Sequence, residues 1–276
     1  MLNWVNIFEA FLIGISIGSF LNVVFYRLPN DISLISPRSF CPKCKKQISW
    51  RENIPLFSWI IQKGRCLSCK EKISIRYPFV ELTSGLLFVL FREASPSIYF
   101  YLNSIPIEIL FNWFFVSLLF IVSLIDIKYY WIPQIFINLG FLFAFFNLIF
   151  VQIVTNFDKL NIFINYSIAS VVSYLLFESL RVVSKYYFKK DALGKGDSKL
   201  VSMMALWLGP LGTTLSLFIT YVFSALCLLS LIQFKVIKRN QIIPFAPFLC
   251  FGGLIVWFFG NQPLINSYLS FLRMFP

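Results

Sequence analysis

Residues 194–210 read Gly-Lys-Gly-Asp-Ser-Lys-Leu-Val-Ser-Met-Met-Ala-Leu-Trp-Leu-Gly-Pro, and apolar sequence continues from there to residue 234. One carboxylate, Asp197, therefore stands at the start of a long apolar segment. Gly194 and Gly196 flank it, and glycine permits backbone geometry and close approaches that other residues do not. We interpret the two glycines as hinges that let an extended peptide or a partner helix approach the acid.

The composition indicates a membrane protein. Of 276 residues, 58% are hydrophobic, 34 are phenylalanine and only 13% of the chain is charged, which is more apolar surface than a soluble core could bury. We expect an all-α polytopic membrane protein with about eight transmembrane helices. The apolar runs that support this count lie at 7–26, 79–91, 107–125, 135–154, 162–180, 200–208, 211–234 and 245–259.

The dipeptide at Gly209 and Pro210 decides the predicted topology. A single long helix through residues 200–234 would place Lys235, Lys238 and Arg239 on the outer side of the membrane. A turn at Gly209 and Pro210 would place them on the cytoplasmic side, where Lys and Arg accumulate, so we expect the turn. With the turn, both termini lie outside and 21 of the 24 basic residues lie on the cytoplasmic side. The exceptions are Arg92, Lys159 and Arg273. The net charge of +12 thus reflects topology, and nucleic acid is not an expected partner.

The first apolar run is expected to be a retained span, because positive charge follows it and a cleaved signal peptide has the opposite order. Gly14, Gly18 and Asn22 repeat at a spacing of four, which predicts a helix face that packs closely against another helix. We expect three parts: a first transmembrane helix at 1–26, a cytoplasmic loop domain with 11 basic residues at 27–78, and a transmembrane bundle at 79–276.

Four cysteines in the loop domain form two C-x-x-C pairs, namely Cys41 with Cys44 and Cys66 with Cys69. Paired motifs of this kind are typical of a tetrahedral zinc site, and a closed four-sulfur shell favours a structural role. A reducing cytoplasm disfavours two disulfides. The alternatives are a redox-active pair or incidental thiols.

A second acid, Asp126, ends the apolar run at 107–125, and the predicted topology puts it on the same membrane face as Asp197. Ionised groups at this depth are costly and usually functional. Each acid also has a structural interpretation. Asp126 could be a solvated acid at a helix end, beside Lys128, and Asp197 could be the N-cap of a helix. The competing membrane-edge acids, which lack glycine flanks, are Glu9, Glu81, Glu108 and Glu178.

The chain contains no histidine, so proton transfer must use other groups. Two carboxylates that share one proton can hydrolyse an amide: the ionised one takes a proton from water while the protonated one hydrogen-bonds the carbonyl. Asp126 and Asp197 are the candidates for such a pair.

The stretch at 194–200 resembles the glycine-x-glycine-aspartate signature of intramembrane aspartyl proteases, and the chain as a whole resembles the type IV prepilin leader peptidases. The further matching pieces are Gly-Ser-Phe-Leu-Asn-Val-Val-Phe-Tyr-Arg-Leu-Pro at 18–29, the paired cysteine motifs, Asn-Ile-Pro at 53–55, Arg-Tyr-Pro-Phe-Val-Glu at 76–81, the Asp126 segment and Ile-Pro-Phe-Ala-Pro-Phe at 243–248. Two positions depart from the family pattern: Gln134, where an acidic residue is common, and Ala246, where glycine is usual.

The resemblance implies a bacterial inner-membrane enzyme that uses Asp126 and Asp197 to remove the leader of type IV prepilins or pseudopilins, on the cytoplasmic side and after a glycine. It also implies methylation of the new N-terminus from S-adenosylmethionine in many members, a function associated with the loop domain. The motifs identify no residues that bind this cofactor. Alternatives from other classes are a proton-coupled membrane transporter and a zinc-containing membrane assembly scaffold.

Overall fold

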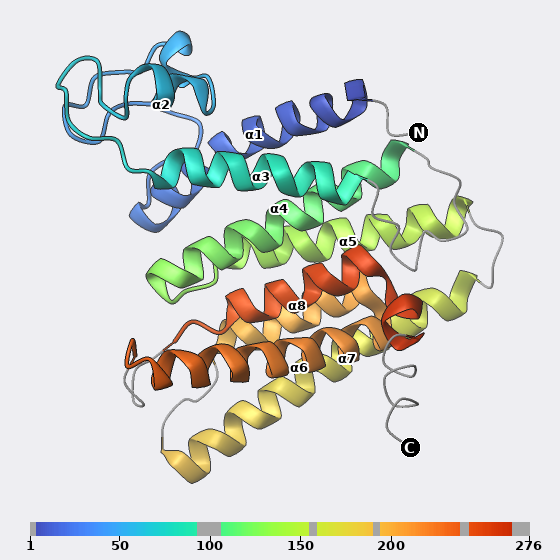
Figure 1. Cartoon of the computed structure of the whole chain (residues 1–276). Coiled ribbons are helices and arrows are strands. Elements are labelled where there is room, and N and C mark those ends of the chain that lie inside the picture. The colour runs from blue at the N-terminus through green and yellow to red at the C-terminus, as the bar shows by residue number, and fades with distance from the viewer. Residues whose placement is uncertain (1–3, 93–105, 155–158, 190–193, 238–242, 267–276) are drawn as a thin grey trace. The chain divides into compact units, whose positions relative to one another are not determined.

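The computed structural model describes residues 4–92, 106–154, 159–189, 194–237 and 243–266, which form helices and connecting loops and include no β-strand (Figure 1). The all-α prediction is confirmed. The chain divides into two compact units, Met1–Glu93 and Ala94–Pro276. The three-part division expected from polarity stays a prediction.

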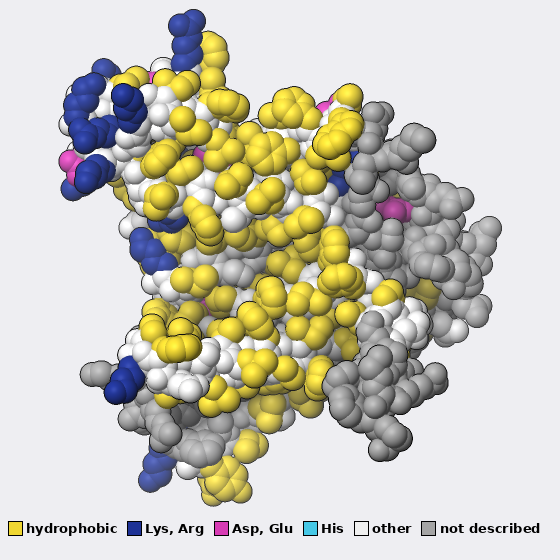
Figure 2. Space-filling view, in the orientation of Figure 1, with side chains coloured by type: hydrophobic (Ala, Val, Ile, Leu, Met, Phe, Trp, Pro, Cys, Tyr) yellow, Lys and Arg dark blue, Asp and Glu magenta, His cyan; other side chains and the backbone are white. Residues whose placement is uncertain are grey.

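Five helices within the described residues are long and apolar enough to cross a membrane, so the chain is a multi-pass membrane protein. They are Trp4–Asn30, Glu108–Tyr129, Gln134–Ile153, Asn161–Tyr187 and Lys195–Gln233. Large hydrophobic side chains stay exposed along them, as on Leu175 and Leu226, which is the surface expected of helices in lipid. Figure 2 shows such side chains spread over the visible flanks of the helices.

The first unit is built on α1 (Trp4–Arg27) and α3 (Arg76–Arg92), which pack closely along the predicted glycine face. A Cβ atom added at Gly14 or Gly18 would come within 2.7 or 2.8 Å of an α3 Cα atom. Asn22 continues this face and its side-chain amide donates to a carbonyl of α3. The close packing predicted from the spacing of four is confirmed.

A polar lobe, residues 28–75, joins the two helices and contains three short helical segments. These are the 3-10 helices η1 (Leu28–Asn30) and η2 (Trp50–Asn53), and α2 (Phe57–Ile61). The main-chain N–H of Leu56 donates to a carboxylate oxygen of Glu81 at 2.8 Å, which ties the lobe to α3. Lys and Arg side chains crowd the lobe around α2 (Figure 2).

In the residues that the structure describes, the second unit contains five helices: α4 (Pro106–Tyr129), α5 (Gln134–Val154), α6 (Lys159–Phe188), α7 (Lys195–Gln233) and α8 (Ala246–Phe259). Its core is aromatic, because Phe115 stacks on Trp207 and also contacts Trp257, with ring centroids 4.7 and 4.9 Å apart. Each buried indole N–H has an acceptor, the carbonyl of Gly140 for Trp207 and the side chain of Asn112 for Trp257. Both indole N–H groups are therefore hydrogen-bonded within the core.

The longest helix, α7, turns back on itself at Gly209, whose φ of 70° and ψ of 179° are non-helical. A straight helix of 39 residues would be about 58 Å long. Contacts with two adjacent residues of α8 show that α7 reverses direction. A Cβ atom added at Gly253 would collide with the Met204 side chain, and one added at Gly252 would collide with the backbone of Ser216. Met204 and Ser216 would lie about 18 Å apart on a straight helix, so the two halves of α7 lie side by side against α8.

Candidate active site and cysteine cluster

Asp126 lies in the last turn of α4, with only 6% of its surface exposed. Its carboxylate accepts a hydrogen bond from the main-chain N–H of Ala246, at 3.2 Å. Ala246 is the first residue of α8, so the donor is one of the free N–H groups at a helix N-terminus, where negative charge is stabilised. Asp126 is thus a buried group with a defined partner and is not a solvated helix-end acid.

Asp197 lies in the first turn of α7 and is 8% exposed. The helix begins at Lys195 with Gly194 as its N-cap, so the interpretation of Asp197 as the N-cap is wrong. Its carboxylate instead accepts the N–H of Gly194 at 3.1 Å. Each of the two acids is therefore held by one main-chain donor at the N-terminal end of a helix.

The second unit brings the two acids together, since Asp126 and Asp197 are close enough for their charges to interact. Cys250 of α8, which the sequence presents only as a cysteine in an apolar run, is buried beside Ser123 and close to both carboxylates. The pair and Cys250 thus come from α4, α7 and α8. Two neighbouring carboxylates can share a proton, as two-acid hydrolysis requires.

The flanking glycines allow close packing around Asp197. Gly194 has φ −71° and ψ 146°, an ordinary extended conformation, and a Cβ atom there would lie 3.2 Å from an Asp197 carboxylate oxygen. A Cβ atom at Gly196 would meet the side chain of Ile132 at 3.0 Å. Neither residue has a positive φ, and their role as hinges stays a prediction.

Gln134, one of the two positions that the resemblance marks as unusual, begins α5 and accepts a hydrogen bond from the ammonium group of Lys199. Its amide N–H₂ also donates to Asn138 at 2.8 Å. Lys199 is two residues beyond Asp197, so this link joins the start of α5 to the first turns of α7. An amide serves this purpose because its carbonyl oxygen accepts from the lysine without being ionised.

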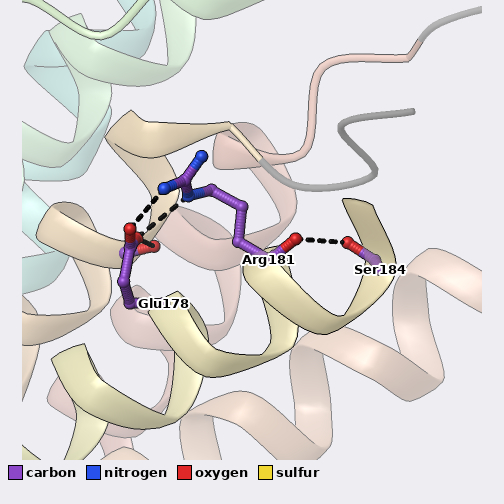
Figure 3. A network of polar contacts seen from close by, with 4 residues as sticks. Glu178, Arg181 and Ser184 are labelled. Atoms are coloured by element: carbon purple, nitrogen blue, oxygen red, sulfur yellow. Dashed lines mark hydrogen bonds and ion pairs between the residues drawn. The ribbon is translucent and has the colours of Figure 1, made fainter. Parts of the chain in front are cut away.

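Glu178, one of the competing acids, is engaged in a network on α6 (Figure 3). Arg181 donates to both of its carboxylate oxygens, through Nε at 3.0 Å and through a second nitrogen. The hydroxyl of Ser198, the residue after Asp197, donates to the same carboxylate at 3.4 Å. Ser184 donates to the Arg181 carbonyl and extends the network along α6. An acid paired with arginine in this way is a weaker candidate for proton transfer than the interacting aspartates.

The four loop cysteines come together in the first unit, with all sulfur atoms within 4.8 Å of one another. The sulfurs of Cys41 and Cys69 are 3.9 Å apart, close to the spacing that a tetrahedron with Zn–S distances of about 2.3 Å requires. The residues present therefore fit a zinc ion.

Two equivalent hairpins supply these ligands. In the first, Cys41 donates its N–H to the Lys46 carbonyl, and in the second Cys66 donates to the Glu71 carbonyl, both at 2.9 Å. The N–H groups of Cys69 and Ser68 lower the pKa of the Cys66 thiol to about 7. This favours the thiolate, which is the form that binds a metal. The spacing of the four cysteines was a sufficient signal for the cluster.

A helical multi-pass membrane protein that buries two interacting carboxylates and contains no histidine has the features of an aspartyl peptidase acting at a membrane boundary. Two family profiles cover most of the chain: "Bacterial Peptidase A24 N-terminal domain" matches residues 12–93 and "Type IV leader peptidase family" matches residues 113–229. The chain belongs to the type IV prepilin leader peptidase family.

Individual relatives agree with this assignment. The chain is 34% identical over 261 residues to the type 4 prepilin-like proteins leader peptide-processing enzyme of Escherichia coli O78:H11, covering 87% of this chain and 89% of that protein. It is 30% identical over 298 residues to a prepilin leader peptidase/N-methyltransferase of Legionella pneumophila, covering 97% and 96%. A protein of that name from Myxococcus xanthus is 36% identical over 198 residues, covering 72% and 55%. No solved structure matches the chain significantly.

Replacing Cys41 and Cys66 together by serine should remove the metal, because the cluster then loses one ligand from each hairpin. We expect the purified protein to contain about one zinc per chain and the double variant almost none, measured by elemental analysis. Cys227→Ser is the control, since that cysteine lies outside the cluster. Unchanged zinc content in the double variant would contradict the assignment.

Proposed function

We propose that this protein is a membrane aspartyl endopeptidase that removes leader peptides from type IV prepilins or pseudopilins, with Asp126 and Asp197 as the catalytic pair. The observation that carries the proposal is the burial of these two carboxylates, close enough for their charges to interact and each with one main-chain donor. Family membership and the names of the relatives support the substrate class. Neither a transporter nor a scaffold is favoured.

The hydrolysis needs only the two acids and one water. The ionised carboxylate takes a proton from water, and the water oxygen bonds to the scissile carbonyl carbon while the protonated carboxyl gives its proton to the carbonyl oxygen. The tetrahedral intermediate then collapses: the C–N bond breaks, the first carboxyl protonates the leaving amine, and the second acid recovers its proton from the diol. The N–H groups of Ala246 and Gly194 hold one oxygen of each acid, so the other stays available for these transfers.

We further propose eight membrane crossings in the bacterial inner membrane. They are α1, α3, α4, α5, α6, the two halves of α7 and α8. The reversal at Gly209 supports counting α7 twice, and the excess of basic residues in the lobe supports placing the lobe and both aspartates on the cytoplasmic side. Both termini then lie outside, and the substrate is cut on the cytoplasmic side after a glycine of its leader.

We assign zinc a structural role in the lobe. Cys41, Cys44, Cys66 and Cys69 would hold it through a complete shell of four thiolates, which leaves no position for a substrate or a water. The lobe is small and has few buried side chains, so the bound metal would supply part of its folding energy.

N-methylation of the new N-terminus is a second activity, which the names of several relatives support. We assign S-adenosylmethionine to no described residues. A groove of about 530 Å³ between α1 and the lobe is lined by Arg27, Arg38 and Trp50 among others. It has no acidic side chain that would accept hydrogen bonds from the amino group or ribose hydroxyls of this cofactor, so the fit is incomplete.

Asp126→Asn and Asp197→Asn should each lower leader cleavage by about 10²- to 10⁴-fold, because asparagine neither takes nor gives the proton. The measurement is cleavage of a prepilin by membranes that contain each variant. Asp31→Asn is the matched control, since Asp31 is exposed and lies outside the pair. Normal cleavage by both active-site variants would show that the acids are not catalytic.

The topology is tested with reporter fusions at three points. Fusions after Lys189 and after Lys235 should both report the cytoplasm, and a fusion after Leu211 should report the outside, because α7 crosses twice. A reporter that is external after Lys235 would mean a single crossing by α7 and would overturn the eight-span proposal.

Methylation is tested on the cleaved product by mass spectrometry, with and without added S-adenosylmethionine. We expect the mature product, which carries the new N-terminus, to gain one methyl group when the cofactor is present. Complete cleavage without that mass increase would leave the protein a peptidase only.

A further inference from the structure

The orientation of Asp197 depends on how α7 is rotated about its own axis. Residues of its first half face three different neighbours: a Cβ atom at Gly196 would meet Ile132, Met204 lies against Gly253 of α8, and Ser202 bonds Ser170 of α6. Asp197 and Met204 are seven residues apart and thus share a face. A small rotation of α7 would therefore move the Asp197 carboxylate away from α8 and from Asp126.

Hydroxyl groups join α7 to α6 at two levels. Ser202 and Ser170 exchange hydrogen bonds of 2.8 to 3.0 Å between their hydroxyls and carbonyls. One turn closer to the start of α7, Ser198 is fully buried and donates to Glu178 at 3.4 Å. Ser198 and Ser202 are four residues apart, so both lie on the face of α7 that packs against α6.

Glu178 is well suited to anchor this contact. The Glu178 side chain is 29% exposed and that of Arg181 is 13% exposed. The Arg181 guanidinium donates hydrogen bonds to both carboxylate oxygens of Glu178 (Figure 3). A bidentate arginine fixes the plane of a carboxylate and keeps it ionised, which makes it a strong and well-oriented acceptor. The Glu178–Arg181 pair thereby offers the Ser198 hydroxyl a fixed acceptor directly beside the turn that carries Asp197.

We propose that Glu178, held by Arg181, is a positioning residue: through Ser198 it sets the rotation of the first turn of α7 and so aims Asp197 at Asp126. The inference rests on the proposed function, because it concerns the geometry of the catalytic pair. Glu178 takes no part in proton transfer. Its effect passes through one hydrogen bond between adjacent helices.

Kinetics of leader cleavage test the inference. Ser198→Ala and Glu178→Ala should each lower kcat by up to about 100-fold with little change in KM, because a misplaced catalytic group affects the reacting geometry and not the binding of the leader. The double variant should be no slower than either single variant, since both remove the same link. Glu178→Gln, which keeps one acceptor oxygen but loses the bidentate contact with Arg181, should restore part of the kcat that Glu178→Ala loses.

Ser170→Ala is the matched control, because it removes a hydroxyl bond between the same two helices but away from the active site. It should lower the melting temperature and leave kcat nearly unchanged. Three results would overturn the inference: additive losses in the double variant, equal kcat losses in Ser170→Ala and Ser198→Ala, or an inactive Glu178→Gln. If Asp197→Asn is inactive while Ser198→Ala is normal, the positioning role fails and the peptidase assignment stands.

Discussion

The second unit depends on the burial of two carboxylates, Asp126 and Asp197, that lie close enough for their charges to interact. A buried carboxylate is costly in apolar surroundings unless it accepts hydrogen bonds. In this protein the donors are main-chain N–H groups at the starts of helices. Ala246 serves Asp126 and Gly194 serves Asp197. The arrangement requires α4, α7 and α8 to meet at one end, which in turn requires α7 to reverse at Gly209 so that both of its halves contact α8.

Features with a regular spacing were predictable from the sequence. The all-helical fold followed from long apolar runs, the cysteine cluster from two paired motifs, and the α1–α3 contact from small residues four apart. The meeting of Asp126 and Asp197 followed less directly, from a charge count that put both on one membrane face. Each of these inferences uses either a short-range sequence pattern or a count of charged residues over the whole chain.

The contacts that define the site were not predictable in this way. The N–H of Ala246 lies 120 positions from Asp126, and a main-chain donor has no signature in the sequence. The link between Glu178 and Ser198 depends on the rotation of two helices, which hydrophobic patterning does not specify because lipid-facing and buried positions are both apolar. Gly194 and Gly196 were recognised from the sequence, but their tight packing against Asp197 and Ile132 required coordinates.

The main-chain origin of the Asp126 donor has an evolutionary consequence. A side-chain donor is lost by almost any substitution, whereas the N–H at position 246 survives every replacement except proline. Position 246 is fully buried, so only small side chains fit there. An exchange between glycine and alanine leaves the hydrogen bond to Asp126 unchanged. Alanine at position 246 therefore keeps the hydrogen bond to Asp126, because the donor belongs to the backbone.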